Sequence, residues 1–168
     1  MKKNPQGEAM MVSLNIPDDV DLLQAAGRVA FAHGQLEIVL RMTVMSLAGL
    51  SIREALDATA TMKAYELRDK IKKLFRCKTR DESAKSKLDA FLNKAKRLSD
   101  KRNILIHRPW AKDPQGQWVV KEEDHAWGQP PSVDALNQLA DEIHQTAIEL
   151  NTARLSGFVK GVASGSRK

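Results

Sequence analysis

A single long run of helical periodicity, over residues 20–48, most constrains how this chain can fold. Its apolar and small residues recur at alternating spacings of three and four, the period of one face of an α-helix. This stripe comprises Leu22, Ala26, Val29, His33, Leu36, Leu40, Thr43 and Leu47. The segment 17–19 (Pro-Asp-Asp) places acidic side chains where the helix dipole favours them. A neighbouring stripe carries Gly27, Ala30 and Gly34, so another helix could pack closely there.

Two capping sequences predict further helices after this one. Ser51 and Glu54 have the spacing of a capping box, which begins a helix by satisfying its first amides, and this second helical stretch has a break near residues 59–61. The segment 79–82 has the same form and begins a third helix. Pro109 ends that helix, because the residue before a proline is pushed out of helical geometry. The third helix has an arginine within its apolar stripe, which comprises Ala84, Leu88, Phe91, Ala95, Leu98, Arg102 and Leu105.

Turn-forming residues mark a change of structure after the third helix. The segment 110–121 contains the turn sequence Asp-Pro-Gln-Gly beside residues with strand character, and it predicts a β-hairpin. Ser132 then caps a last helix. The predicted fold class is therefore all-α: a four- to five-helix bundle with a small β-hairpin inserted before the last helix. We expect one helical domain at residues 17–160, a flexible lead at 1–16 and a flexible tail at 161–168.

Positive charge is concentrated in the middle of the chain. Residues 63–112 hold 17 of the 27 lysines and arginines and 6 of the 21 aspartates and glutamates. A basic middle between acidic flanks suits a phosphate-rich partner, although a solvated lysine face on a long helix would give the same pattern. If RNA is the partner, we expect its backbone to contact Lys70, Lys73, Lys94, Lys101 and Arg108.

The sequence lacks the features of a secreted, membrane-spanning or metal-binding protein. Residues 1–10 carry two lysines with no apolar stretch behind them, and no segment approaches the roughly 18 apolar residues of a membrane span. The single cysteine, Cys77, cannot form an internal disulfide. We therefore expect a cytoplasmic protein with no membrane partner. Cys77, His125 and His144 do not stand at the spacing of metal ligands, so we expect no metal and no cofactor.

The segment 102–107, Arg-Asn-Ile-Leu-Ile-His, carries the residues that point to a function. An arginine, then a polar residue, then a histidine after four to six intervening residues is similar to the motif of the HEPN family. The resemblance implies a helical bundle, often paired as a dimer, that cleaves RNA without a metal. It also implies that Arg102, Asn103 and His107 are the catalytic residues.

Arg28 and His33 have the same spacing and are the competing candidate within this chain. An asparagine follows the arginine at Arg102, whereas a valine follows Arg28. His107 lies just before Pro109, at a helix end, whereas His33 lies mid-helix on an apolar stripe and is expected to be a core histidine. The surroundings of Arg102 are basic, and those of Arg28 are acidic. The motif at 102–107 is therefore the better candidate.

The chemistry of RNA cleavage matches these residue types. A base must remove the 2′-hydroxyl proton, an acid must protonate the leaving 5′-oxygen, and a cation must stabilise the charge on phosphorus. His107 suits proton transfer and Arg102 suits charge stabilisation. Asn103 lies four residues from His107 and shares its helix face, so we expect it to hydrogen-bond the imidazole. Arg102 and His107 are about 140° apart around a straight helix and do not share a face.

Two further expectations follow from this assignment. Glu37, beside the small residues of the first helix, is a candidate either for a structural ion pair with Arg102 or for an acid that orients His107. One histidine serves two proton transfers poorly, so we expect a homodimer that pairs two motifs, which is also the arrangement that the resemblance implies.

Three functions remain open at this stage. The first is a metal-independent endoribonuclease, a toxin or phage-defence effector by analogy with the family. The second is a non-catalytic HEPN-like module that binds RNA or a protein, such as a cognate antitoxin or a small nucleotidyltransferase. The third is a purely structural dimerisation protein. The tryptophans at 110, 118 and 127 either stack on RNA bases or hold the hairpin against the helices.

Overall fold

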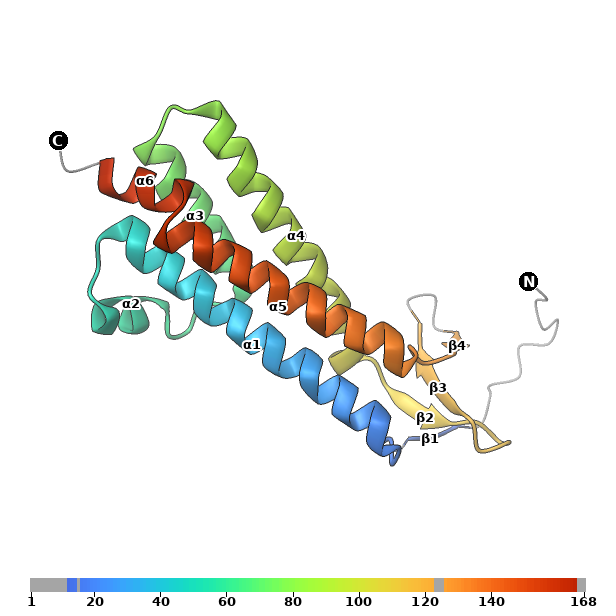
Figure 1. Cartoon of the computed structure of the whole chain (residues 1–168). Coiled ribbons are helices and arrows are strands. Elements are labelled where there is room, and N and C mark those ends of the chain that lie inside the picture. The colour runs from blue at the N-terminus through green and yellow to red at the C-terminus, as the bar shows by residue number, and fades with distance from the viewer. Residues whose placement is uncertain (1–11, 15, 123–125, 166–168) are drawn as a thin grey trace.

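The computed structural model describes residues 12–14, 16–122 and 126–165. This part of the chain is mostly helical, with a small antiparallel sheet of four strands at one end (Figure 1). The long helices at residues 20–48 and 133–155 lie side by side, and the remaining helices pack around them. The helices are α1 (Val20–Ala48), α2 (Ile52–Thr59), α3 (Ala64–Lys78), α4 (Glu82–His107), α5 (Val133–Leu155) and α6 (Phe158–Gly165).

The helices begin and end where the capping residues predict. The side chain of Asp19 accepts a hydrogen bond from an amide of the first turn of α1, and Ser51 forms a reciprocal capping box at α2. The capping box predicted at residues 79–82 does not form: the N-cap of α4 is Asp81, whose carboxylate accepts from two backbone amides of the helix. Ser132 caps α5, and α4 ends two residues before Pro109. These boundaries confirm the predicted helices.

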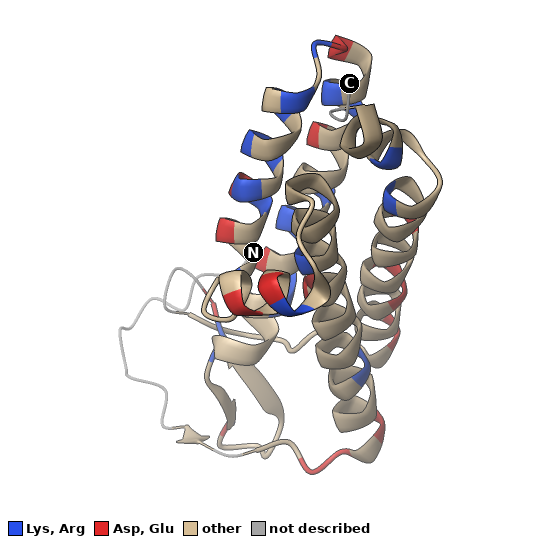
Figure 2. Ribbon diagram, turned by 90° about the vertical axis from the view of Figure 1, so that its left-hand side faces the viewer, with Lys and Arg blue, Asp and Glu red and all other residues tan. Residues whose placement is uncertain are grey.

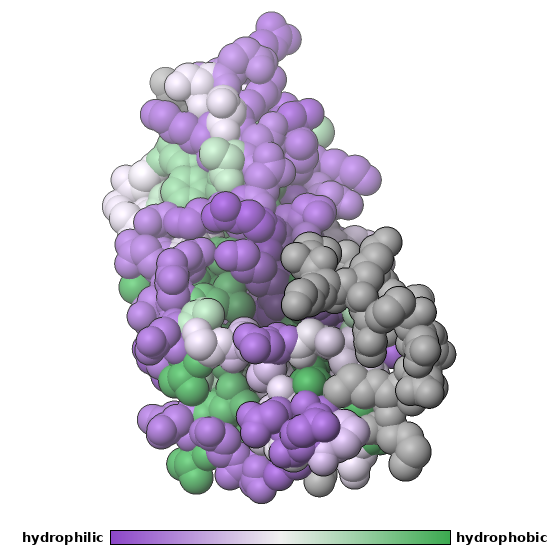
Figure 3. Space-filling view, turned by 90° about the vertical axis from the view of Figure 1, so that its right-hand side faces the viewer, coloured by the Kyte–Doolittle hydropathy of each residue, from purple (hydrophilic) through white to green (hydrophobic). Residues whose placement is uncertain are grey.

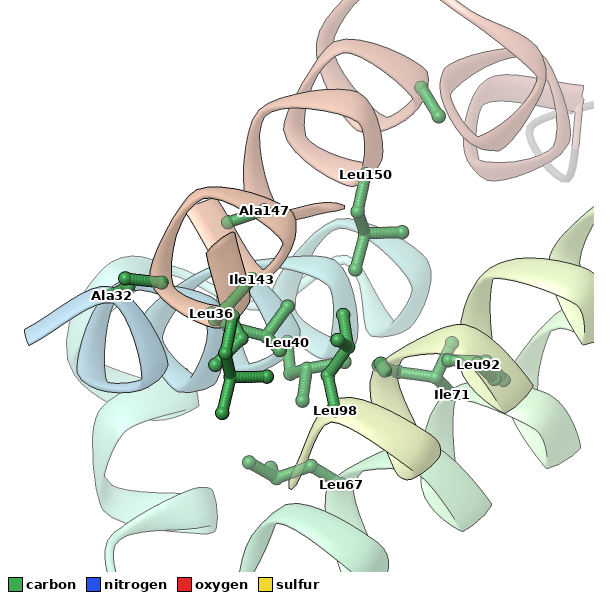
Figure 4. Packing of buried hydrophobic residues seen from close by; sticks show 14 of the residues in the cluster. Ala32, Leu36, Leu40, Leu67, Ile71, Leu92, Leu98, Ile143, Ala147 and Leu150 are labelled. Carbon is green, nitrogen blue, oxygen red and sulfur yellow. The ribbon is translucent and has the colours of Figure 1, made fainter. Parts of the chain in front are cut away.

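An apolar core fills the space between α1, α3, α4 and α5. Figure 4 shows Leu36 and Leu40 of α1, Leu98 of α4 and Ile143 of α5 meeting in this space. All four side chains are fully buried. The contact between α1 and α5 is the most extensive between any two elements. The predicted stripe of α1 is therefore confirmed as part of the core.

The sheet connects the end of α4 to the start of α5. Its strand order is β1-β2-β3-β4, and every neighbouring pair is antiparallel. The pair β2–β3 is the predicted hairpin, and Gly116, with a φ of 79°, supplies the left-handed position in its turn. The indole of Trp110 donates to the carbonyl of Leu105 at 3.2 Å and ties the sheet to α4. The strands are β1 (Ser13–Leu14), β2 (Trp110–Lys112), β3 (Trp118–Lys121) and β4 (Trp127–Gly128).

The structure differs from the predicted organisation at both ends. Ser13 and Leu14 pair with β2, so part of the lead predicted at 1–16 joins the sheet. The helix α6 follows α5, so the hairpin lies before the second-to-last helix and not directly before the last one. The helix α6 extends through the described part of the predicted tail at 161–168. Residues 1–11, 15 and 166–168 of these two segments lie outside the described residues.

The surface at the sheet end is mainly hydrophilic, and its hydrophobic residues form separate small patches (Figure 3). Among the described residues, no single helix is long and apolar enough to cross a membrane. The pair α1 and α2, which is bent by 118° at its break, passes the same test of length and composition.

Candidate functional site

A cavity of about 580 Å³ lies between α1, the start of α3 and the C-terminal half of α4. All three residues of the predicted motif line it, together with residues from the two other helices and from the α2–α3 connection. The lining comprises His33, Glu37, Met62, Lys63, Ala64, Tyr65, Arg68, Ser99, Asp100, Arg102, Asn103 and His107.

The motif residues occupy the last turns of α4. His107 is the final residue of that helix and is exposed, and Arg102 is half-buried. Although they are five residues apart on the helix, both line the cavity. The Nη1 of Arg102 donates to the Oδ1 of Asn103 at 3.2 Å. The expected hydrogen bond from Asn103 to His107 is therefore wrong: the amide oxygen binds the guanidinium, and the imidazole bonds to none of the described residues.

The wall opposite the motif is formed by His33 and Glu37 of α1. His33 is buried, as predicted for a core histidine, and its Nε2 lies 3.1 Å from the Oγ of Ser99 on α4. Its Nδ1 lies 3.8 Å from the Oε1 of Glu37. Glu37 is thus close to the motif, but its partner is His33, and the alternatives of pairing with Arg102 or orienting His107 are not the arrangement observed.

The environment of His33 favours its neutral form. Burial lowers the pKa of this histidine below its usual value of 6.5, and this is the largest influence. The carboxylate of Glu37 opposes the shift, while the guanidinium groups of Arg102 and Arg68 lower the pKa further. Two arginines that line the cavity therefore favour the neutral form of a histidine that lines it with them.

Arg68 and Lys63 line the cavity and were missed by the sequence prediction. Arg68 is buried, with 9% of its surface exposed, and its Nη1 has no hydrogen-bond partner among the described residues. A signal for it exists in the sequence, because the inner stripe of α3 comprises Leu67, Ile71 and Phe75, and Arg68 interrupts it. On α4, Arg102 interrupts an apolar stripe in the same way.

The connection between α2 and α3 forms the rim of the cavity and is held in place by Arg41 of α1. One nitrogen of its guanidinium donates to the carbonyl of Thr59, and another donates to the carbonyl of Met62 at 3.1 Å. Two hydrogen bonds from one planar group fix the path of the connection. They also fix the start of α3, on which Arg68 lies one turn further along.

The basic residues predicted to contact RNA do not line this cavity. On α3, Lys70 and Lys73 lie about 200° and 140° around the helix from Arg68. Lys94 pairs with Glu149 of α5 at 3.3 Å. Lys101 and Arg108 line a second, mostly apolar cavity of about 370 Å³ beside the sheet.

Charge on the helical surface is mixed rather than uniformly basic. Figure 2 shows basic segments recurring along the helices in the upper part of the molecule, with acidic segments between them. Asp89, for example, pairs with both Lys72 and Arg76. The excess of positive charge in residues 63–112 is therefore partly neutralised where it meets acidic neighbours.

The arginine of the competing candidate motif, Arg28, has a structural role. Arg28 donates to Asn137 at 2.6 Å and to Asp141 at 2.8 Å, which ties α1 to α5. His33 does not share a site with Arg28 but lines the cavity of the other motif.

The tryptophans of the sheet are engaged with their own chain. Trp110 bonds to α4 and packs against the core. The Nζ of Lys112 lies 4.7 Å from the ring centroid of Trp118, and that of Lys121 lies 4.9 Å from the ring of Trp127. These contacts favour the interpretation that the tryptophans stabilise the sheet.

No family model matches this chain, and comparison with curated proteins and with solved structures found no significant match. Among the described residues, no cluster of three or more histidine, cysteine or acidic side chains has the geometry of a metal site. His125 lies outside those residues, and His144 bonds to Gln35 of α1 at 2.9 Å. The cavity and its side chains are therefore the features of this protein that point to a function.

The lowered pKa of His33 predicts a pH-dependent stability. Just below pH 6.5 the unfolded chain takes up a proton at this histidine, and the folded protein does not. The free energy of unfolding should therefore fall as the pH falls through this window. His33→Gln, which keeps a hydrogen-bonding group near Ser99, should reduce that dependence. Urea denaturation on either side of pH 6.5 measures it.

The matched control is His144→Gln, which replaces an exposed histidine and should keep the wild-type dependence on pH. If His33→Gln and the wild type lose stability equally over this window, His33 does not have the environment described.

Proposed function

We propose that this protein is a cytoplasmic, metal-independent endoribonuclease of HEPN type, with its helices arranged as the helical bundle of that family. The observation that carries the proposal is that Arg102, Asn103 and His107 line one cavity. The imidazole of His107 and the guanidinium of Arg102 supply a proton-transfer group and a cation, two of the three groups that RNA cleavage requires. By analogy with the family, the protein would act as a toxin or as a phage-defence effector.

In the proposed reaction the 2′-hydroxyl oxygen attacks the adjacent phosphorus and the bond from phosphorus to the 5′-oxygen breaks. His107 accepts the proton of the 2′-hydroxyl as the new bond forms. Arg102 stabilises the charge that develops on the phosphate oxygens, and Asn103 holds the guanidinium through their 3.2 Å hydrogen bond. A second proton-transfer group protonates the leaving 5′-oxygen, and the products are a 2′,3′-cyclic phosphate and a free 5′-hydroxyl.

A homodimer would supply the second proton-transfer group. The outward face of α1 is apolar, with Leu23, Phe31 and Ile38 exposed. Gly27 and Gly34 lie on the same face, and a Cβ added at either would meet nothing within 4 Å, so the described part of the chain does not cover them. A second copy of α1 could therefore approach closely there.

This apolar face borders the cavity. At 100° per residue, Glu37 lies about 40° and Gly34 about 100° around α1 from His33. Two copies joined through these faces would bring their cavities near the two-fold axis, so His107 of each copy could serve a shared RNA strand.

The non-catalytic alternative is supported by one observation. The imidazole of His107 has no hydrogen bond to the described residues, so nothing in one copy fixes its tautomer. A module that binds RNA, a cognate antitoxin or a nucleotidyltransferase without cleavage would not need that orientation. RNA cleavage by the purified protein separates the two functions.

The catalytic assignment predicts the effect of three substitutions. His107→Ala should reduce RNA cleavage by about 10²–10⁴-fold, because it removes proton transfer. Arg102→Ala should reduce it by about 10²–10³-fold, because it removes charge stabilisation. Asn103→Ala should cost less, because Asn103 only orients Arg102. EDTA should not change the rate, and the cleaved ends should carry 2′,3′-cyclic phosphates.

His144→Ala and Arg97→Ala, at exposed positions that do not line the cavity, are the matched controls and should retain full activity. Circular dichroism should show that every variant is folded. Wild-type protein that binds RNA without cleaving it would support the non-catalytic module. Cleavage that EDTA stops would contradict the mechanism.

The dimer predicts that one charge on the apolar face of α1 is disruptive. Phe31, which is 81% exposed, should become buried between two copies, and Phe31→Glu should therefore give a monomer. Light scattering at micromolar concentrations measures the mass. Ile148→Glu, at an exposed position on α5, is the control and should remain a dimer. A monomeric wild type, or a dimeric Phe31→Glu variant, would contradict the arrangement.

A further inference from the structure

Two arginines on different helices line the same cavity, and each has one buried nitrogen atom without a partner among the described residues. The Nη1 of Arg68 on α3 and the Nε of Arg102 on α4 are both buried, and neither has a hydrogen-bond partner among the described residues. Arg68 as a whole is about nine-tenths buried. Burying a charged group without a partner is costly, so such a group calls for a physical explanation.

Other arginines between helices of this protein are satisfied. Arg28 bonds to Asn137 and Asp141, and Arg41 bonds to two backbone carbonyls. Arg154 is also partly buried, and it donates to Asn151 at 2.7 and 3.1 Å. These three guanidinium groups each have at least two hydrogen bonds within the described part of the chain. Arg68 differs from this pattern, which indicates that its partner is not a part of the described chain.

We propose that this cavity is a phosphate-binding site in which Arg68 and Arg102 hold the phosphate group between them. Guanidinium groups bind phosphate oxygens through paired, charge-assisted hydrogen bonds, and two of them on facing helices would contact different oxygens. The phosphate belongs either to a free nucleotide or to an RNA strand. The RNA form rests on the proposed function, and there Arg68 is a second charge-stabilising residue outside the motif.

The start of α3 adds to the attraction for an anion. Ala64 and Tyr65 line the cavity in the first turn of this 15-residue helix, whose N-cap residue, Lys63, forms no side-chain cap. First-turn amides and the positive end of the helix dipole favour a bound phosphate. The carboxylate of Glu66 accepts a hydrogen bond from the backbone amide of Lys63, at 2.7 Å, and from no other amide of the described residues.

The two carboxylates of the cavity do not neutralise the arginines directly. Glu37 lies beside His33, and Asp100 pairs with Lys96 at 2.8 Å. Burial lowers the pKa of Arg68, while Asp100 and Asp69 oppose that shift from beyond ion-pair distance. The cavity therefore keeps two cationic groups available to an anion.

The test is isothermal titration of the full chain with three probes: inorganic phosphate, adenosine 5′-monophosphate and a short RNA with 2′-O-methyl groups, which cannot be cleaved. Arg68→Met should weaken binding of the probe that the site recognises by about 10- to 100-fold, the value of hydrogen bonds to a charged group. Arg76→Met, on the same helix but in an exposed pair with Asp89, is the control and should bind like the wild type.

Thermal unfolding distinguishes a binding role from a structural one. Arg68→Met should melt at the same temperature as the wild type or higher, because it removes a buried charge that has no partner. A lower melting temperature with unchanged phosphate binding would overturn the proposal. Arg68→Lys, which keeps the charge, is the second variant in case Arg68→Met does not fold. It should bind at least about tenfold more weakly than the wild type, because it loses the forked geometry. Equal affinity of Arg68→Lys and the wild type for the probe would also overturn the proposal.

The outcomes separate this site from the proposed reaction. Binding of any probe that depends on Arg68, without RNA cleavage by the wild type, supports the phosphate site and contradicts the ribonuclease. Cleavage with binding that does not depend on Arg68 supports the ribonuclease and contradicts the phosphate site. Binding of the mononucleotide but not of the RNA identifies a free nucleotide as the source of the phosphate. No binding of any probe by the wild type overturns the proposal.

Discussion

The packing of α1 against α5 is the contact on which the other features of this protein depend. Leu36 and Leu40 of α1 are fully buried against Ile143 and the rest of the inner face of α5, and α4 closes the core through Leu98 (Figure 4). Apolar burial of this extent is the main source of stability in a helical protein. It also fixes α1 and α4 relative to one another.

The candidate site lies beside that core, where polar residues replace apolar ones on the inner faces of the helices. On α1 the buried stripe passes through His33, and on α4 Arg102 interrupts the apolar stripe, so both helices place charged or titratable groups in the cavity beside the start of α3. Arg68 then contributes a third such group from the inner face of α3. Polar groups at core positions reduce stability unless they are bonded, so their presence on three helices at one place favours a functional interpretation.

The sequence predicted local structure well because the signals are local. Ser51 and Ser132 cap helices at the predicted positions, and the period of the apolar residues identifies the buried faces. The hairpin followed from its turn residues, but β1 did not, since Ser13 and Leu14 pair across nearly a hundred residues. The site was found in part: spacing along α4 identified its motif. Arg68 interrupts an apolar stripe in the sequence, but its place in the site follows only from the packing of α3 beside α4. Asn103 does not form the bond expected to His107, and its amide oxygen accepts from Arg102 instead.

A crystal structure with a short RNA that cannot be cleaved tests the central claim most directly. The account predicts a phosphate group in the cavity between α1, α3 and α4, within hydrogen-bonding distance of Arg68 and Arg102. It also predicts that the ribose 2′ position faces His107. RNA bound instead along the second cavity, beside Lys101 and Trp110, with no contact to Arg102, would contradict it.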